Sequence, residues 1–407
     1  SSRELQRSTT QCAIAGGGPA CVMLGYLLAR SGIEVVILEK WPDFLRDFRG
    51  DTIHPSTMEI LHELGILDDF LNLPHNKVRQ VTGQFGGNLV TIADFSRLRT
   101  RAPFVAFTPQ WNFLDFLASK GRAYQQFNLM MGVEVTGIIE ESGSIVGLTA
   151  INEGGKFDVR ADLVVGADGR HSTVRESAAL EVEDLGAHVD VLWFRVCRQC
   201  TYPYQLFGIV DEGKLLVMID RGDYWQCAFT IVKGDFERIK EGAIEDFRQS
   251  IARLAPFTST RVDELHDWEE IKLLSIAVDH LKRWYRPGLL CIGDAAHAMS
   301  PIGGVGINLA IQDAVAAAHV LVPAFKEGTP TEQELARIQQ RREGPTRKTQ
   351  RLQVTLQERV LFPYLESEGT ARLPFVLRLF NWFPPLRAIP ARFIGIGFRP
   401  EHIEHRD

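Results

Sequence analysis

The chain has 407 residues, a formal net charge of −6 at pH 7, 45% hydrophobic residues and 24% charged residues, which are ordinary values for a globular protein. The mild acidity argues against nucleic acid as a partner, because nucleic-acid binding needs a clustered basic surface. Neither a run of 18 apolar residues nor a signal-peptide pattern is present, so we expect no membrane span and a cytoplasmic location.

A strand–helix–strand unit is predicted at the start of the chain. Residues 11–15 form a short apolar run, a glycine-rich turn follows, and residues 20–29 are apolar with a helical pattern. Residues 33–38 are apolar and β-branched and end at Glu39. This spacing is typical of a βαβ unit whose strands are buried on both faces.

The next elements alternate between helices and strands. Helices are predicted over 55–64 and 110–119, and a strand pair over 81–101 with its turn at Gly86-Gly87. Three further strands are predicted over 133–139, 144–151 and 157–165, and the turn at 153–155 joins the last two as a hairpin.

The pattern changes between about residues 184 and 278. Strands are predicted over 189–196, 215–219 and 225–232, with a helix over 244–254, which favours an antiparallel sheet. A buried strand returns at 289–292, and a long alanine-rich helix follows Asn308. The nucleotide domain is therefore expected to be discontinuous, with the sheet domain inserted into it.

The predicted fold is α/β, with a Rossmann-like nucleotide-binding domain, an inserted, mainly antiparallel β-sheet substrate domain and a C-terminal helical region. We assign residues 1–80, 104–184 and 279–345 to the first domain, 81–103 and 185–278 to the second, and 346–407 to the third. Residues 373–398 are apolar with interspersed arginines, a mixture typical of a packed subdomain, a subunit contact or a surface-bound membrane helix. Pro384, Pro385 and Pro390 disfavour the membrane helix.

The first motif is A-G-G-G-P-A-C at residues 15–21. Gly16 permits the tight turn after the strand, and Gly18 lets the backbone approach a pyrophosphate at the helix N-terminus. Cys21 occupies the third position of the G-x-G-x-x-G pattern, where glycine or alanine is usual. Glu39 is placed to accept hydrogen bonds from ribose hydroxyls and to repel a 2′-phosphate, which favours FAD or NAD.

Two further motifs join a buried strand to a glycine and an acid. The second is D-L-V-V-G-A-D-G-R-H-S-T-V-R at 162–175, in which Asp168-Gly169 taken alone is an ordinary turn. The third, G-L-L-C-I-G-D-A-A-H-A-M-S-P-I-G-G-V-G-I-N at 288–308, places Asp294 after a strand and a glycine-rich loop before a helix. Bare backbone suits a flat ring, and the helix N-terminus suits a reduced, anionic flavin.

With these three motifs in this order, residues 11–345 resemble the FAD-dependent aromatic hydroxylases related to para-hydroxybenzoate hydroxylase. The resemblance implies FAD as cofactor and an AMP-binding role for the first motif. It matches Arg49 to an arginine that contacts the cofactor, Gln110 to a cofactor-binding glutamine and Val135 to a backbone contact with adenine. The implied cofactor residues are Gly16, Gly18, Pro19, Ala20, Glu39, Lys40, Arg49, Gln110, Val135, Asp168, Gly169, Asp294, Pro301, Gly303, Gly304, Val305, Gly306, Ile307 and Asn308.

The chemistry that the resemblance implies is aromatic hydroxylation. NADH or NADPH reduces the flavin, O2 forms a flavin C4a-hydroperoxide, and one oxygen atom attacks an electron-rich small molecule in a dry pocket. No second dinucleotide fingerprint appears, so the nicotinamide is expected to dock transiently. Trp193, Phe207, Tyr224 and Trp225 are candidate pocket walls, although strand alternation sends only half of such residues inward.

Several alternatives stay open. A flavin-dependent halogenase needs a lysine beside the oxidant and a W-x-W-x-I-P segment, which the stretch at 224–229 does not match. A prenyl-chain reductase and a non-catalytic FAD-binding regulator are the others. The sequence identifies no catalytic base, and it leaves a homodimer open. We interpret His297, beside Asp294, as a loop-bonding residue, and make no assignment for His54.

Cysteine usage indicates no metal site. Six cysteines in a chain of this length do not suggest a disulfide framework. Cys197 and Cys200 form a C-x-x-C pair, which is the pattern of a redox pair or of half a zinc site, but further ligands at zinc spacing are missing nearby. We favour two residues at the end of an apolar strand.

Overall fold

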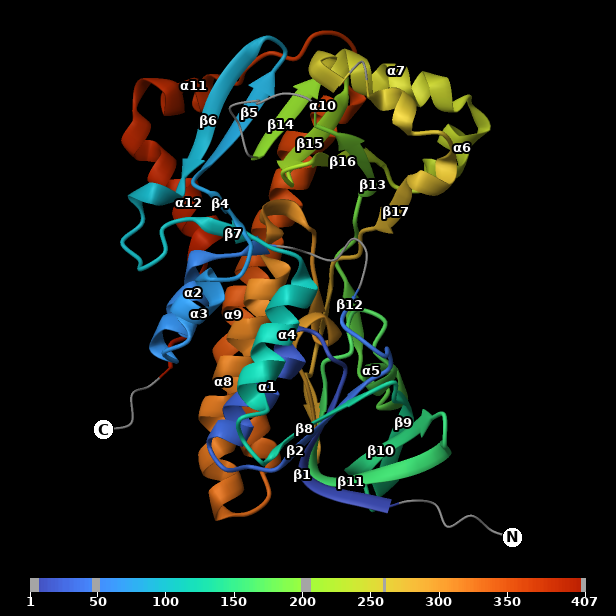
Figure 1. The fold of residues 1–407 in the computed structure, drawn as a ribbon, viewed down its shortest axis with the longest axis vertical. Coiled ribbons are helices and arrows are strands. Elements are labelled where there is room, and N and C mark those ends of the chain that lie inside the picture. The colour runs from blue at the N-terminus through green and yellow to red at the C-terminus, as the bar shows by residue number, and fades with distance from the viewer. Residues whose placement is uncertain (1–6, 46–51, 199–205, 259–260, 404–407) are drawn as a thin grey trace.

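The computed structural model describes residues 7–45, 52–198, 206–258 and 261–403, and two large sheets lie at opposite ends of an elongated molecule (Figure 1). The lower sheet has eight strands in the order β19-β20-β11-β1-β2-β8, with β10 and β9 joined beside β11. In that order the strands are β19 (Tyr285–Arg286), β20 (Leu289–Cys291), β11 (Gly155–Gly166), β1 (Arg7–Ala15), β2 (Val35–Glu39) and β8 (Phe127–Met131), with β10 (Ser144–Asn152) and β9 (Glu134–Glu141).

Helices cover one face of this sheet. The helix α1 (Pro19–Arg30) packs against α4 (Gln110–Gly121) and α8 (Gly306–Glu327), and α9 (Glu332–Leu356) packs on α8. On the other side, α5 (Thr173–Ser177) contacts β9 (Figure 1). The segment Ile302–Glu327 is long and apolar enough to cross a membrane by composition, and 72% of its apolar window is buried inside the protein, as in the core helix of a globular domain.

The carboxyl ends of four parallel strands lie in one row. Ala15 of β1 pairs with Gly166 of β11 and lies one position from the end of β2, since it also pairs with Leu38. Gly166 in turn pairs with Cys291, the last residue of β20. Residues that follow these strands therefore meet at one edge of the sheet, which is where parallel α/β sheets bind ligands.

The upper sheet has seven strands in the order β17-β13-β16-β15-β14-β5-β6, and every neighbouring pair is antiparallel except β14 with β5. The helices α6 (Phe236–Glu241) and α7 (Ile244–Leu254) cover its outer face, where Phe247, Ile251 and Leu254 are buried. In that order the strands are β17 (Lys272–Ser275), β13 (Val189–Cys197), β16 (Tyr224–Val232), β15 (Lys214–Asp220), β14 (Leu206–Asp211), β5 (Gln80–Phe85) and β6 (Asn88–Asp94).

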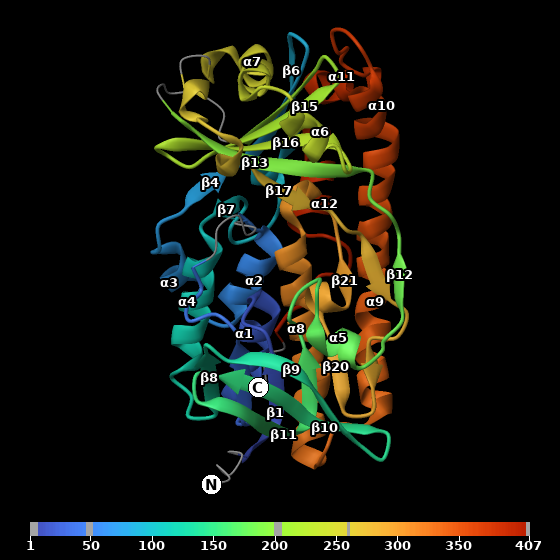
Figure 2. The ribbon, with the colours of Figure 1, turned by 90° about the vertical axis from the view of Figure 1, so that its right-hand side faces the viewer.

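Short elements connect the two sheets, as the rotated view shows (Figure 2). Two three-stranded sheets lie between them, one formed by β3 (Thr52–Ile53), β7 (Val105–Phe107) and β4 (Asn76–Val78), the other by β12 (Val182–Asp184), β18 (Asp279–Leu281) and β21 (His297–Ala298). The helices α2 (Pro55–Glu63) and α3 (Leu67–Leu71) lie beside the first of these sheets.

The C-terminal region is helical and packed against the rest of the chain. A π-helical turn (Gln357–Leu361) connects α9 to α10 (Phe362–Glu366), and α11 (Phe375–Trp382) and α12 (Ala388–Gly395) both pack on β6. These two helices therefore cover the edge strand of the upper sheet, a common protection against edge-to-edge pairing. The helix α9 runs continuously through residue 346, where the sequence placed the start of this region.

Most predicted elements are present with ends shifted by a few residues. The predicted strand pair over 81–101 is wrong beyond residue 94, because Asp94 ends β6 and its Oδ1 accepts a hydrogen bond from the backbone N–H of Ser96, 3.1 Å away. A 3-10 turn (Phe95–Arg97) follows instead. The domain division stays a prediction, which the membership of β5 and β6 in the upper sheet supports.

A cofactor cleft between the two sheets

A cavity of about 1120 Å³ lies at the carboxyl edge of the lower sheet and reaches the inner face of the upper sheet. All three sequence motifs line it, together with Gln110 of α4 and Val135 of β9. The predicted cofactor residues that line it are Gly16, Gly18, Pro19, Ala20, Glu39, Lys40, Gln110, Val135, Asp168, Gly169, Asp294, Pro301, Gly304, Gly306 and Ile307.

The first motif has the local geometry of a dinucleotide cradle. Gly16 has φ +108°, and a Cβ there would lie 2.6 Å from the carbonyl oxygen of Ala167, so only glycine fits between the first two motifs. A Cβ on Gly18 would meet nothing within 4 Å, and this open space lies at the N-terminus of α1. Open space in front of unpaired backbone N–H groups is what a pyrophosphate requires.

Cys21 fits the third position without displacing α1. Its side chain is fully buried, and the thiol donates a hydrogen bond to the carbonyl oxygen of Ala167, 2.9 Å from Sγ. Burial raises the pKa of this thiol well above its usual range, with Glu39 and Asp168 adding to the shift. Cys21 is therefore a neutral donor that ties α1 to the end of β11.

Glu39 lies at the cavity wall, directly against the glycine run. Its Oε1 accepts a hydrogen bond from the backbone N–H of Trp41, 3.1 Å away. A Cβ on Gly17 would lie 2.3 Å from Glu39 Oε2 and 2.9 Å from Glu39 Cβ, so a side chain at residue 17 would displace Glu39. Sequence reasoning did not assign Gly17, although three consecutive glycines followed by an acid at the next strand end carry that signal.

Asp168 lines the cavity and also forms hydrogen bonds that hold the start of a helix. Its carboxylate accepts hydrogen bonds from the Ser172 hydroxyl, from the Thr173 N–H at 2.9 Å and from the Val174 N–H at 3.3 Å, so it caps α5. Burial raises its pKa, and these bonds oppose that shift. A role towards a ligand hydroxyl stays a prediction.

The third motif divides between the cavity and the protein interior. Gly303 does not line the cavity, and a Cβ on it would instead face the side chain of Ile394 in α12. Asn308 is buried, and its Oδ1 accepts from the backbone N–H of His54 at 2.9 Å and from the hydroxyl of Thr57 at 2.6 Å. Val305 does not line the cavity either. These three residues do not line the cavity, and their contact with the cofactor stays a prediction.

Two predicted residues fall outside the described part of the chain. Arg49 lies in the gap between residues 45 and 52, and Cys200 lies in the gap between residues 198 and 206. Cys197 is exposed, and its backbone N–H donates to Glu264 Oε2 at 3.1 Å. Among the described residues, no group of three or more His, Cys, Asp or Glu side chains is placed to hold a metal ion.

The inner face of the upper sheet closes the far end of the cavity. Trp193 and Tyr224 line it as predicted, but Trp225 points to the opposite face, where it packs with Phe257. This correction follows from strand alternation, because 224 and 225 are neighbours on β16. The backbone of Phe207 lies in β14, and its side chain is outside the described part.

Basic and aromatic side chains that the sequence did not single out also line this end. The guanidinium of Arg195 lies 4.8 Å from the ring centroid of Tyr224, and that of Arg221 lies 5.4 Å from the ring centroid of Phe107. Lys272 lines the same end. His75 lines it as well, and its ring is nearly parallel to those of Phe70 and Phe104, with centroids 6.4 Å away in each case. Only the fold brings His75, Arg195, Arg221 and Lys272 together, since these four basic residues come from four separate segments.

Two buried histidines near the third motif have opposite electrostatic surroundings. His54 is held by the carbonyl oxygen of Ile394, 2.7 Å from Nδ1, and burial lowers its pKa to about 4. For His297, burial acts to lower the pKa, but the carboxylate of Asp313 outweighs it, and the net shift of the pKa is upward. The interpretation of His297 as a residue that bonds the loop backbone is not supported, because its Nε2 lies 2.5 Å from the side-chain Oδ2 of Asp313 in α8 and its Nδ1 has no hydrogen-bond partner among the described residues.

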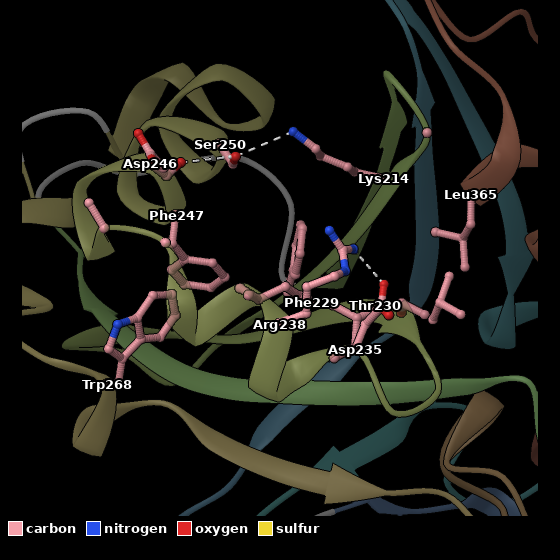
Figure 3. A pocket seen from close by; sticks show the side chains of 16 residues that line it. Lys214, Phe229, Thr230, Asp235, Arg238, Asp246, Phe247, Ser250, Trp268 and Leu365 are labelled. Atoms are coloured by element: carbon pink, nitrogen blue, oxygen red, sulfur yellow. Dashed lines mark hydrogen bonds and ion pairs between the residues drawn. The ribbon is translucent and has the colours of Figure 1, made fainter.

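A second, smaller cavity of about 290 Å³ lies on the outer face of the upper sheet, beneath α6 and α7. Figure 3 shows Lys214 reaching across it to the hydroxyl of Ser250, 3.3 Å away, and Arg238 paired with Asp235 at 2.7 Å. It shares no lining residue with the cleft, so the sheet separates the two.

Comparison with known proteins identifies the family. Residues 9–351 match the family model described as FAD binding domain. The 6-methylpretetramide 4-monooxygenase of Streptomyces rimosus is 32% identical over 385 residues, which cover 94% of this chain and 91% of that protein.

Solved structures show the same fold. PqsL of Pseudomonas aeruginosa, in complex with 2-aminobenzoylacetate, has a TM-score of 0.75 at 21% identity, covering 88% of this chain and 100% of that one. The myxobacterial chondrochloren halogenase CndH has a TM-score of 0.74 at 19% identity, covering 94% of this chain and 91% of that one. With the FAD-type cleft and the family match together, this chain belongs to the FAD-dependent aromatic hydroxylases and is an FAD-dependent monooxygenase.

Proposed function

We propose that this monooxygenase hydroxylates a polycyclic phenol or enol that binds as its anion, with NADH or NADPH as reductant and O2 as oxidant. The observation that carries the substrate class is the wall formed by the upper sheet. Of the described residues that this sheet contributes to the cleft, none is acidic, whereas Arg195 and Lys272 are basic and Trp193 and Tyr224 are aromatic. The relative named 6-methylpretetramide 4-monooxygenase supports an organic small-molecule substrate that is oxygenated by this family.

The chain's own residues divide the work between the two ends of the cleft. When bound, FAD supplies the oxygen-activating chemistry, and the motifs at the carboxyl edge of the lower sheet would hold it. At the other end, Arg195 and Arg221 favour the ionised form of a phenol, because a nearby cation lowers the pKa of an acidic hydroxyl. An ionised ring is richer in electrons and reacts more readily with an electrophilic oxygen.

Arg195 is placed for this role by the register of the sheet. It lies directly opposite Gln226 on β16, and Tyr224 lies diagonally beside it on the same face. The cation–π contact with Tyr224 holds the guanidinium against the wall, on the face of the sheet that lines the cleft.

The test is a paired substrate panel. Polycyclic phenols and their O-methyl ethers, matched in size, are compared for stimulation of NAD(P)H oxidation and for the mass of the product. The proposal predicts strong stimulation and gain of one oxygen atom with the phenols, and weak stimulation with the ethers. Equal activity with the ethers would contradict the anionic substrate, and chlorinated or brominated product in the presence of halide would favour the halogenase alternative.

A further inference from the structure

A series of buried charged side chains runs from the third motif to residues 399–403, called here the C-terminal tail. Asp313 of α8 is fully buried, and its Oδ2 accepts from the backbone N–H of Gly293 at 2.9 Å and contacts His297 Nε2 at 2.5 Å. One carboxylate thus binds both ends of the G-D-A-A-H turn. Gly293 has φ +62° and immediately precedes Asp294, which lines the cofactor cleft.

Arg342 of α9 is the next member of this series of charges, on the side of Asp313 that faces away from the cleft. It is fully buried, and its Nε lies 3.6 Å from Asp313 Oδ1. Neither of those two atoms has a hydrogen-bond partner among the described residues, so they interact as charges. On its other side, Arg342 Nη1 donates to the carbonyl oxygen of Arg399 at 2.8 Å and lies 3.5 Å from Glu401 Oε1.

Glu401 connects this series of buried charges to the C-terminal tail. Its carboxylate is buried and receives two donors from the side chain of Arg341, with Nη2 2.6 Å from Oε2. Its backbone N–H donates to the side-chain oxygen of Gln312, the residue next to Asp313. The tail is thereby bound to α8 and α9 on the side of the third motif that faces away from the cleft.

We infer that His297, Asp313, Arg342 and Glu401 form a positioning unit that holds the Gly293-Asp294 turn in its FAD-binding conformation and makes the C-terminal tail part of the cofactor site. The physical reason is that a buried charge without its counter-charge is costly, so each member fixes the place of the next. None of the four is a catalytic residue. The inference rests on FAD binding and is independent of the proposed substrate.

The experiment compares two carboxylates that bind the same tail. Glu401→Gln removes the negative charge that faces Arg342. The control, Glu63→Gln, makes the same change at the other contact with these residues, in which Glu63 contacts His402 Nδ1 at 2.9 Å and accepts from the Ile403 N–H at 3.1 Å without reaching Asp313. For each variant, the FAD dissociation constant is measured by flavin fluorescence, the midpoint potential by dye equilibration, and the melting temperature on apoprotein.

The positioning unit predicts that Glu401→Gln weakens FAD binding by about tenfold, the worth of one charge-assisted hydrogen bond, and shifts the flavin potential. Glu63→Gln is expected to lower the melting temperature with FAD affinity and potential unchanged. Equal effects of the two variants on FAD affinity and potential, or wild-type values of both in Glu401→Gln, would overturn the inference.

A milder variant tests the inference if Glu401→Gln does not fold. The side chain of Arg341 is 46% exposed, so Arg341→Gln releases Glu401 from the surface side with little risk to the core. It is expected to weaken FAD binding by a few-fold in the same direction. Wild-type affinity and potential in Arg341→Gln, when Glu401→Gln does not fold, would overturn the inference as well.

Discussion

Single residues decide whether the cleft can hold FAD, and the glycines of the first motif do so in two different ways. Gly16 is required by the fold, since a side chain there would meet the backbone of Ala167. Gly18 is not, because its surroundings are open. A substitution at Gly18 can therefore change FAD binding without changing the stability of the fold, which makes Gly18 the better position to test.

Gly18→Ala is therefore expected to leave the apoprotein as stable as the wild type while weakening FAD binding by at least about tenfold, because the new methyl group takes space needed by the pyrophosphate. Calorimetric titration with FAD and thermal denaturation of the apoprotein measure the two effects. Gly87→Ala is the matched control, since a Cβ there also meets nothing within 4 Å but lies in the β5–β6 turn. Unchanged FAD affinity in Gly18→Ala would exclude this placement of the pyrophosphate.

The pKa shifts of two buried histidines predict a maximum in the pH dependence of stability. The pKa of His54 falls to about 4 on folding, so the unfolded state binds the proton first, and stability is lost as the pH falls from about 6.5 towards 4. His297 has a raised pKa in the folded state, so its contribution is complete below about pH 6.5 and is lost as the pH rises through the folded pKa.

Urea unfolding between pH 5 and 8 checks this dependence, with a slope of at most about 1.4 kcal/mol per pH unit for each histidine. His54→Asn is expected to flatten the acidic side, and His297→Gln the alkaline side, because each replacement keeps a donor where the ring had one. If both variants keep the slopes of the wild type, other groups cause the pH dependence.

The strands and helices around the lower sheet were largely predictable, because the patterns that indicate them lie within short stretches of sequence. Strands 11–15 and 33–38, the helix between them and the acid at residue 39 follow from apolar runs and glycine position alone. Their meeting at one sheet edge follows from parallel pairing. What periodicity could not show is how a loop turns after its motif, and Gly303, Val305 and Asn308, which were assigned to the cofactor, do not line the cavity.

The position of α1 depends on a small side chain at residue 21. Cys21→Ala is expected to keep FAD binding and to lose at most about 1 kcal/mol of unfolding free energy, the worth of one hydrogen bond. Cys21→Leu is expected to push α1 away from Ala15 and Ala167 and to reduce the flavin content of the purified protein severalfold, because the site has no space for the added atoms. Absorbance at the flavin band and thermal denaturation measure both, and full flavin content in Cys21→Leu would contradict this packing.

At the scale of the molecule, function depends on two sheets that the chain builds from interleaved segments. The predicted cofactor residues line the cleft at the lower sheet, and the proposed substrate wall lines it at the upper sheet. The sequence predicted the inserted sheet but did not show which of its side chains face the cleft. Trp193 and Tyr224 line the cleft as predicted, whereas the adjacent Trp225 packs on the other face. Arg195, Arg221 and Lys272 were missed because nothing in their local sequence distinguishes a cleft-lining cation from a solvated one.

The two faces of the upper sheet provide a matched pair of arginine variants. Arg195→Gln is expected to raise the KM for a phenolic substrate by about tenfold, with a smaller change in kcat, since it removes a cation that binds the ionised hydroxyl. Arg238→Gln, on the outer face seen in Figure 3, is expected to leave both constants unchanged. Steady-state NAD(P)H oxidation measures them, and equal effects of the two variants would remove Arg195 from the substrate site.

FAD bound in the cleft is expected to drive oxygen transfer from O2 onto an aromatic ring. Turnover of a phenolic substrate under ¹⁸O2 with NAD(P)H, followed by mass spectrometry of the product, tests this expectation. We predict that the product carries one ¹⁸O atom and that label from H2¹⁸O is not incorporated. Substrate-stimulated NAD(P)H oxidation that yields only hydrogen peroxide, or a product without ¹⁸O, would contradict it.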